Sequence, residues 1–263
     1  MRETVEIGNL NLALAYGLLL FPLAIILWYR VPMLGETVQS VVRMTVQLVF
    51  VGLYLEVVFR LDWWWLNALW LLVMIAVADV SVVRGAGLRI RRFAAPLFVA
   101  LLAGAAVPLL FFMGVILRRP FPLEAQFAIP IGGMILGNCL RADIIGIRSF
   151  YEAIRHNEKA FLHALAQGAR LGEATRPYMR NAAHAALGPA VATMATIGIV
   201  ALPGMMTGVI LAGADPLTAI KYQIAIMIAI FSGTALTVAL AIRLTMRRSF
   251  TAYGTLDADI FRK

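Results

Sequence analysis

Charged residues are scarce in this chain of 263 residues, where they make up 14% of the sequence. An ordinary soluble domain has about 25% charged and about 45–50% apolar residues, whereas 62% of this chain is apolar. The apolar residues are spread from one end to the other. This balance excludes a soluble enzyme, a soluble domain with one anchor and a disordered chain. It predicts a polytopic membrane protein that forms a single domain over residues 1–263.

Several reactive groups and motifs are also missing. Cysteine occurs once, as Cys139, which excludes a disulfide framework and a four-cysteine zinc site. No lysine follows a glycine, so the chain has no Walker A loop for ATP, and no H-E-x-x-H motif occurs. His156 and His163 are seven residues apart and could share a metal, but solvated surface histidines are the simpler interpretation. We therefore expect no enzyme activity and no cofactor in this chain, and leave metal ligands unknown.

Long apolar runs dominate what is present. A helix needs about 20 apolar residues to cross a bilayer, and the runs do not alternate as β-barrel strands do. We therefore predict an all-α protein with about seven transmembrane helices. The predicted spans are residues 10–29, 37–58, 63–83, 94–117, 126–146, 189–212 and 218–242.

Basic residues between the spans predict the orientation. With the N-terminus outside, the inner segments hold 17 Arg and Lys residues and the outer segments hold 4. Cytoplasmic loops are enriched in these residues, so we expect a multi-pass membrane protein with its N-terminus out and its C-terminus in. The same rule explains the net charge of +9 without a nucleic-acid partner.

Residues 147–188 form the longest segment between spans and are rich in charge. Ser149 and Glu152 match a capping box, which predicts the start of a helix there. Gly168 and Gly172 would break it, and Pro177 would start a second helix. The sequence thus predicts a cytoplasmic amphipathic helical hairpin. Such a hairpin could lie on the membrane surface or could dock a soluble partner, and the pattern alone leaves both interpretations open.

Polar residues within the spans are costly and suggest function. Gln39, Arg43 and Gln47 recur every four residues along the second span, where Arg43 could reach the interface, pair with Glu36 or Asp79, or line a pathway. Four polar residues crowd the inner end of the fifth span, and an ion pair between the two charged ones is the simplest interpretation: Asn138, Cys139, Arg141 and Asp143.

The sixth predicted span contains the sequence LPGMMTG, residues 202–208. Pro203 removes a backbone donor and Gly204 weakens the helix, so we expect a break at this point. Broken helices at membrane depth are tolerated where they line a cavity or pack tightly. Met205 and Met206 alone are poor evidence for a metal site, because methionine usually serves packing.

Three stretches resemble FetB-type ABC transporter permeases, the membrane subunits of a bacterial iron export system, which are similar to plant proteins linked to aluminium tolerance. The stretches are LPGMMTGVILAGADPLTAIKYQI at 202–224, RMTVQLVFVG at 43–52 and IPIGGMILGN at 129–138. The resemblance implies a permease that exports iron or another metal from the cytoplasm. It also implies a partner ATPase subunit that binds ATP and magnesium, a permease homodimer and a location in the lipid of the bacterial inner membrane.

The resemblance also interprets the hairpin. ABC permeases carry an E-A-A-x-x-x-G-A loop that docks on the ATPase, and LHALAQGA at 162–169 matches it at Ala164, Gly168 and Ala169. Leu162 and His163 depart from the pattern. We extend the docking hypothesis to Glu173 and Pro177. For the translocation path or hinge, the candidates are Arg43, Gln47, Asn138, Pro203, Gly204, Met205, Met206 and Thr207.

Three alternatives remain open. The cargo could be something other than a metal, such as a nucleotide sugar. An intramembrane enzyme would need a nucleophile and a base, or metal ligands, at one depth, and none is visible. A secondary transporter usually shows inverted repeats and charged groups near the midplane, which we do not find.

Overall fold

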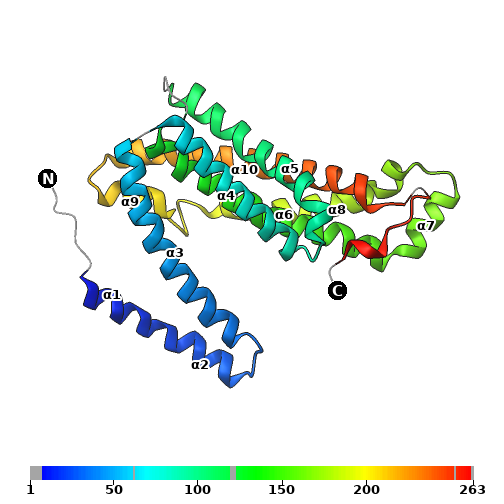
Figure 1. Cartoon of the computed structure of the whole chain (residues 1–263), viewed down its shortest axis with the longest axis horizontal. Coiled ribbons are helices and arrows are strands. Elements are labelled where there is room, and N and C mark those ends of the chain that lie inside the picture. Colours follow the sequence, from blue (N-terminus) through cyan, green and yellow to red (C-terminus); the bar gives the residue numbers. More distant parts are fainter. Residues whose placement is uncertain (1–7, 62, 119–122, 252, 262–263) are drawn as a thin grey trace.

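The computed structural model describes residues 8–61, 63–118, 123–251 and 253–261, and helices dominate these residues (Figure 1). The α-helices are α1 (Asn9–Tyr16), α2 (Leu20–Trp28), α3 (Leu34–Leu61), α4 (Trp64–Gly85), α5 (Ile90–Phe111), α6 (Ala125–His156), α7 (Glu158–Ala166), α8 (Leu171–Thr196), α9 (Gly204–Leu211) and α10 (Pro216–Ser249). A 3-10 turn joins α1 to α2, a π-helical turn follows α5, and a second 3-10 turn lies at Ala258–Ile260. The prediction of an all-α membrane protein is confirmed.

Six of the seven predicted spans are long apolar helical runs in the described residues: Leu10–Trp28, Leu34–Leu61, Trp64–Gly85, Ile90–Ile116, Ala125–His156 and Pro216–Ser249. The predicted span 189–212 is different, because α8 ends at Thr196 and α9 starts only at Gly204. Gly198 has a φ of +87°, outside the helical region, and Pro203 precedes α9 in an extended conformation. The break therefore covers residues 197–203 rather than Pro203 and Gly204 alone.

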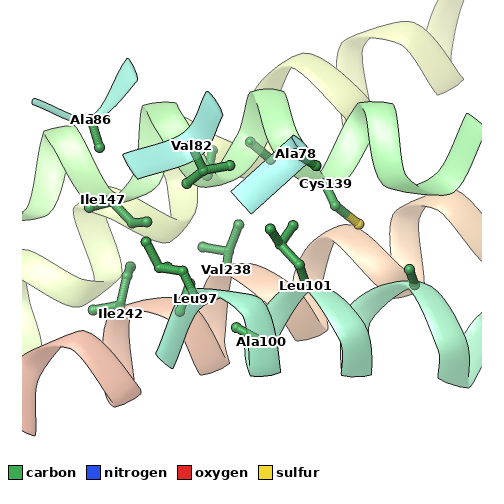
Figure 2. Packing of buried hydrophobic residues seen from close by; sticks show 14 of the residues in the cluster. Ala78, Val82, Ala86, Leu97, Ala100, Leu101, Cys139, Ile147, Val238 and Ile242 are labelled. Atoms are coloured by element: carbon green, nitrogen blue, oxygen red, sulfur yellow. The ribbon is translucent and has the colours of Figure 1, made fainter. Parts of the chain in front are cut away.

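Helices α4, α5, α6, α8 and α10 pack side by side, and we call them the body (Figure 1). Their inward faces are apolar: Ala78 and Val82 of α4 lie near Leu101 of α5, Cys139 of α6 and Val238 of α10 (Figure 2). Two glycines allow the closest approach. A Cβ added at Gly104 of α5 would lie 2.6 Å from Cβ of Thr237, and one at Gly233 of α10 would lie 2.5 Å from the Gly104 carbonyl oxygen. Small residues thus bring α5 and α10 into backbone contact.

The first three helices, which we call the arm (residues 9–61), project from the body (Figure 1). In the most apolar stretch of the first span, none of the residues is buried. In the corresponding stretch of α3, 6% of the residues are buried, whereas 33–50% are buried in the membrane spans of the body. The arm meets the body near the end of α3, where Val58 packs against Ala125 and Ile129 and the ring of Tyr54 stacks on Trp70 at 4.0 Å. The rest of α3 diverges from the body.

The end of the molecule that carries α7 corresponds to the predicted cytoplasmic hairpin (Figure 1). The prediction that a helix starts at Ser149 is wrong, because α6 continues without a break to His156. Glu152 does not cap a helix; it pairs with Arg148 one turn earlier, at 2.8 Å. The second helix of the hairpin begins at Leu171, so Gly172 and Pro177 both lie inside α8.

Candidate docking corner and transmembrane path

The turn between α7 and α8 is built around Gly168. Its φ of +89° is a conformation that side chains other than glycine rarely adopt. In this turn the Gly168 N–H donates to the Leu165 carbonyl at 3.0 Å, and the Ala169 N–H donates to the Ala164 carbonyl at 3.1 Å. These bonds end α7 and reverse the chain into α8. We call residues 158–177 the corner.

Glu173 and Arg170 fix the start of α8. The Arg170 backbone N–H donates to Oε2 of Glu173 at 2.8 Å, which satisfies a backbone donor at the start of the helix. The negative charge also lies at the positive end of the helix dipole. Glu173, predicted to contact a partner, thus has a structural role in the corner as well.

The predicted docking residues divide into an exposed set and a supporting set. Gly168, Glu173 and Pro177 are exposed, whereas Ala164 and Ala169 are half-buried and pack against the core. An open hollow of about 750 Å³ lies beside α8. Four polar side chains and one proline of α8 line this hollow: Glu173, Arg176, Pro177, Arg180 and Asn181. The corner therefore presents a rigid turn beside a charged concave surface, which suits a soluble protein partner.

Predicted path residues on α3 lie on its exposed surface. Arg43 and Gln47 are both exposed, and among the described residues Arg43 forms no ion pair with Glu36 or Asp79. Gln47 precedes Tyr54 by seven residues and Val58 by eleven, so it shares the helix face that contacts the body further along. This polar face therefore points into the space that opens where α3 diverges from the body.

The other predicted path residues lie elsewhere. Asn138 of α6 is half-buried and donates to the Met134 carbonyl at 2.8 Å. Pro203 precedes α9, Gly204 is its first residue, and the Thr207 hydroxyl donates back to the Pro203 carbonyl at 3.1 Å. Met205 packs against the core of the body, and Met206 is half-buried. The predicted path residues thus lie on three separate elements, and no hydrogen bond or ion pair within the described part of the chain joins them into one site.

The interior of the body holds a polar pair that the sequence did not predict. Asp143 of α6 is fully buried and accepts a hydrogen bond from the Thr237 hydroxyl of α10 at 2.8 Å. Its second carboxylate oxygen has no hydrogen-bond partner within the described residues. The expected ion pair with Arg141 does not form, since Arg141 is exposed. The signal available in the sequence was the spacing of Cys139, Asp143 and Ile147, which places Asp143 on the apolar face of α6.

Comparisons with known proteins find relatives that are named as membrane proteins and as a permease. The model of an uncharacterised protein family, UPF0014, matches residues 9–250. A UPF0014 membrane protein from Synechocystis is 33% identical, covering 94% of this chain and 95% of the relative. The probable iron export permease protein FetB of Escherichia coli is 31% identical over 98% of both chains. The protein ALUMINUM SENSITIVE 3 of Arabidopsis thaliana is 32% identical over 81% of this chain and 77% of its own. No solved structure matches the chain.

Proposed function

The chain belongs to the UPF0014 family of membrane proteins, and on this premise we propose that it is the permease subunit of an ATP-binding cassette transporter in the bacterial inner membrane. The relative named as a probable iron export permease supports this role, because the two chains align over 98% of their lengths. ATP and magnesium would bind to a separate ATPase subunit, which converts hydrolysis into movement of the membrane helices.

The corner is the observation that carries the proposal. A permease needs a stiff element at its cytoplasmic end that an ATPase can push or pull. Here the positive φ of Gly168 fixes the turn, and Glu173 fixes the first turn of α8. Because α8 extends from the corner through 26 residues, about 39 Å at 1.5 Å per residue, a displacement of the corner reaches deep into the body.

Co-purification tests the docking. The partner is identified by expressing the tagged chain in its native host and detecting an ATPase in the purified complex. Gly168→Leu should abolish that association, because leucine disfavours a φ of +89°. Gly172→Leu is the matched control, since Gly172 is also exposed but lies within helix α8. Equal ATPase binding by both variants would contradict docking at this turn.

The proposed cargo is iron or another metal ion moving out of the cytoplasm, on the basis of the relative's name. Vesicles that contain the purified complex, with its ATPase on the outer surface, should accumulate ferrous iron when ATP is added. Accumulation of a labelled nucleotide sugar in place of iron would show that the permease has a non-metal cargo. If neither accumulates while ATP is hydrolysed, the metal assignment is wrong.

We further propose that the functional permease is a homodimer whose arms contact the second copy. Contact with lipid alone would be unfavourable for this face of α3, because Arg43 and Gln47 are exposed within its membrane span. A two-fold related copy presents the same stripe, and glutamine can both donate and accept hydrogen bonds across such an interface. In this arrangement the polar stripe lies at the junction of the two copies, where a path could form.

Disulfide cross-linking tests this arrangement in a Cys139→Ser background. Gln47→Cys should give a cross-linked dimer in native membranes. Val42→Cys is the control, because Val42 is exposed less than two helical turns away but projects about 140° from Gln47 around α3. Cross-linking at position 42 and none at position 47 would mean that the polar stripe does not face the second copy.

A further inference from the structure

The chain beyond α10 folds back over the end of the body that carries the corner. After Ser249, the Thr251 N–H donates to the Thr255 carbonyl at 2.9 Å and Gly254 adopts a φ of +77°. The chain then returns, and the Asp257 N–H donates to the Ser249 carbonyl at 2.9 Å. We call residues 250–251 and 253–261 the strap; it is the red segment beside α7 in Figure 1.

One end of the strap is fixed to the loop between α4 and α5. The Arg89 N–H donates to the Ile260 carbonyl at 3.0 Å, and Leu88 forms a bridge with Phe261. Nη1 of Arg92 lies 2.6 Å from Oδ2 of Asp257, and both side chains are only about one-third exposed. Because Leu88 and Ile260 are buried as well, this attachment combines a partly shielded ion pair with apolar packing.

The other end of the strap touches the corner. The ring of Phe250 lies 5.8 Å from that of Phe161 in α7, and Phe161 also packs edge-on against Tyr178 of α8 at 6.1 Å. Gly254 approaches Leu165 so closely that an added Cβ would lie 3.3 Å from its Cδ1. Phe161 is buried, so α7 rests on the strap through its apolar face.

The C-terminal part of α6 contacts both ends of the strap. The ring of Phe261 meets Tyr151 edge-on at 6.4 Å and lies under the Arg155 guanidinium at 5.4 Å. Tyr151 is buried and its hydroxyl is 2.6 Å from that of Ser249, where the strap begins. The strap thus connects the corner, the end of α6 and the loop between α4 and α5 through one continuous set of contacts.

We propose that the strap transmits displacement of the corner to α4 and α5, and that Asp257 and Arg92 are the positioning residues of this link. This inference rests on the proposed function, since the displacing force would come from an ATPase docked at the corner. Without the strap, movement of α7 would reach the body mainly through α8 and α6, which are its principal neighbours among the described residues. With the strap in place, the same movement also displaces the loop that connects α4 to α5.

Hydrogen exchange on the purified permease alone tests the link independently of any ATPase. Asp257→Asn keeps the shape of the side chain but removes its charge. It should increase amide exchange about fivefold both at residues 86–92 and in α7, because loss of a partly shielded ion pair frees one end of the strap. Asp259→Asn is the matched control, since Asp259 is mostly exposed and its contact with Arg89 is longer, at 3.3 Å. Faster exchange at residues 86–92 with no change in α7 would overturn the proposal.

Measurements on the complex with the ATPase then distinguish a loss of coupling, seen as less cargo transported per ATP, from a loss of stability. Asp257→Asn should bind the ATPase and melt within a few degrees of the wild type, yet transport several-fold less cargo per ATP hydrolysed. Asp257→Glu retains the charge and should restore much of the coupling. Wild-type transport per ATP in Asp257→Asn would overturn the link. If the wild-type chain binds no ATPase at all, the proposed function fails, whereas the exchange result still decides whether the strap connects the two regions.

Discussion

At the scale of single residues, the buried carboxylate of Asp143 has one hydrogen-bond donor within the described residues, the Thr237 hydroxyl. Thr237→Val removes this donor at nearly constant volume and leaves both oxygens unsatisfied. We expect a loss of about 1–3 kcal/mol in the free energy of unfolding, seen as a lower melting temperature in detergent. Thr245→Val is the control, because the Thr245 hydroxyl is also buried in α10 but donates to carbonyl oxygens of its own helix rather than to a carboxylate. Equal melting of the two variants would show that the bond to Asp143 adds no stability.

Gly233 offers a second test at this scale. An added methyl group would lie 2.5 Å from the Gly104 carbonyl oxygen, which is backbone and cannot move aside cheaply. Gly233→Ala should therefore destabilise the body by about 1–3 kcal/mol through overpacking. Gly137→Ala should be neutral or slightly stabilising, since a Cβ there meets no atom within 4 Å. The comparison is a melting curve for each variant, and a neutral Gly233→Ala would mean that α5 and α10 can separate without cost.

The polar residues also show which part of the site the sequence could predict. Asp143 and Arg141 are two positions apart, so on a helix they project about 200° from one another and cannot form the expected pair. This error could have been avoided from spacing alone. Thr237 could not have been identified as the partner of Asp143, because that contact depends on the register between α6 and α10, which are 94 residues apart at this point.

At the scale of elements, the strap should respond to acid. The guanidinium of Arg92 is the main cause that lowers the pKa of Asp257 below its usual value of 3.8. A lowered pKa in the folded state means that the ion pair contributes stability above pH 3.8 and loses it as the pH falls through the folded pKa. Hydrogen exchange at residues 86–92 should therefore be constant from pH 7 to about pH 5, after correction for intrinsic rates, and rise below about pH 4. Asp257→Asn should abolish the rise; a rise of the same size in that variant would assign it to another group.

The break between α8 and α9 gives a further element-scale prediction. Gly198 needs a φ of +87°, whereas a Cβ at Gly204 would meet nothing within 4 Å. Gly198→Ala should strain the break by about 1–2 kcal/mol and slow transport in vesicles. Gly204→Ala should leave the melting temperature unchanged, because Gly204 does not make room for a closely packed neighbour. If Gly198→Ala transports like the wild type, the geometry of the break is not needed for the cycle.

The length of the apolar runs predicted most membrane-spanning helices well, whereas local motifs predicted the ends of the helices poorly. Ser149 and Glu152 match a capping box, but a capping box forms only where the preceding residues are not helical. Here apolar packing stabilises α6 as a continuous helix as far as His156. The strap was not predicted at all. Its residues are few and mixed in polarity, and its contacts with Arg89 and Arg92 join positions about 165 residues apart.

At the scale of the whole molecule, the orientation of the chain remains a prediction that follows from the basic residues between spans. The turn between α9 and α10 and the corner lie toward opposite ends of the molecule (Figure 1). A charged maleimide that cannot cross the membrane should therefore label Ala214→Cys in intact cells and should label Gln167→Cys only after the cells are opened. Both side chains are exposed, and the experiment uses a Cys139→Ser background so that no other thiol reacts. Labelling of position 167 from outside would place the docking corner, and with it any ATPase partner, on the wrong side of the membrane. The proposed mechanism would then fail as a whole, because ATP is supplied from the cytoplasm.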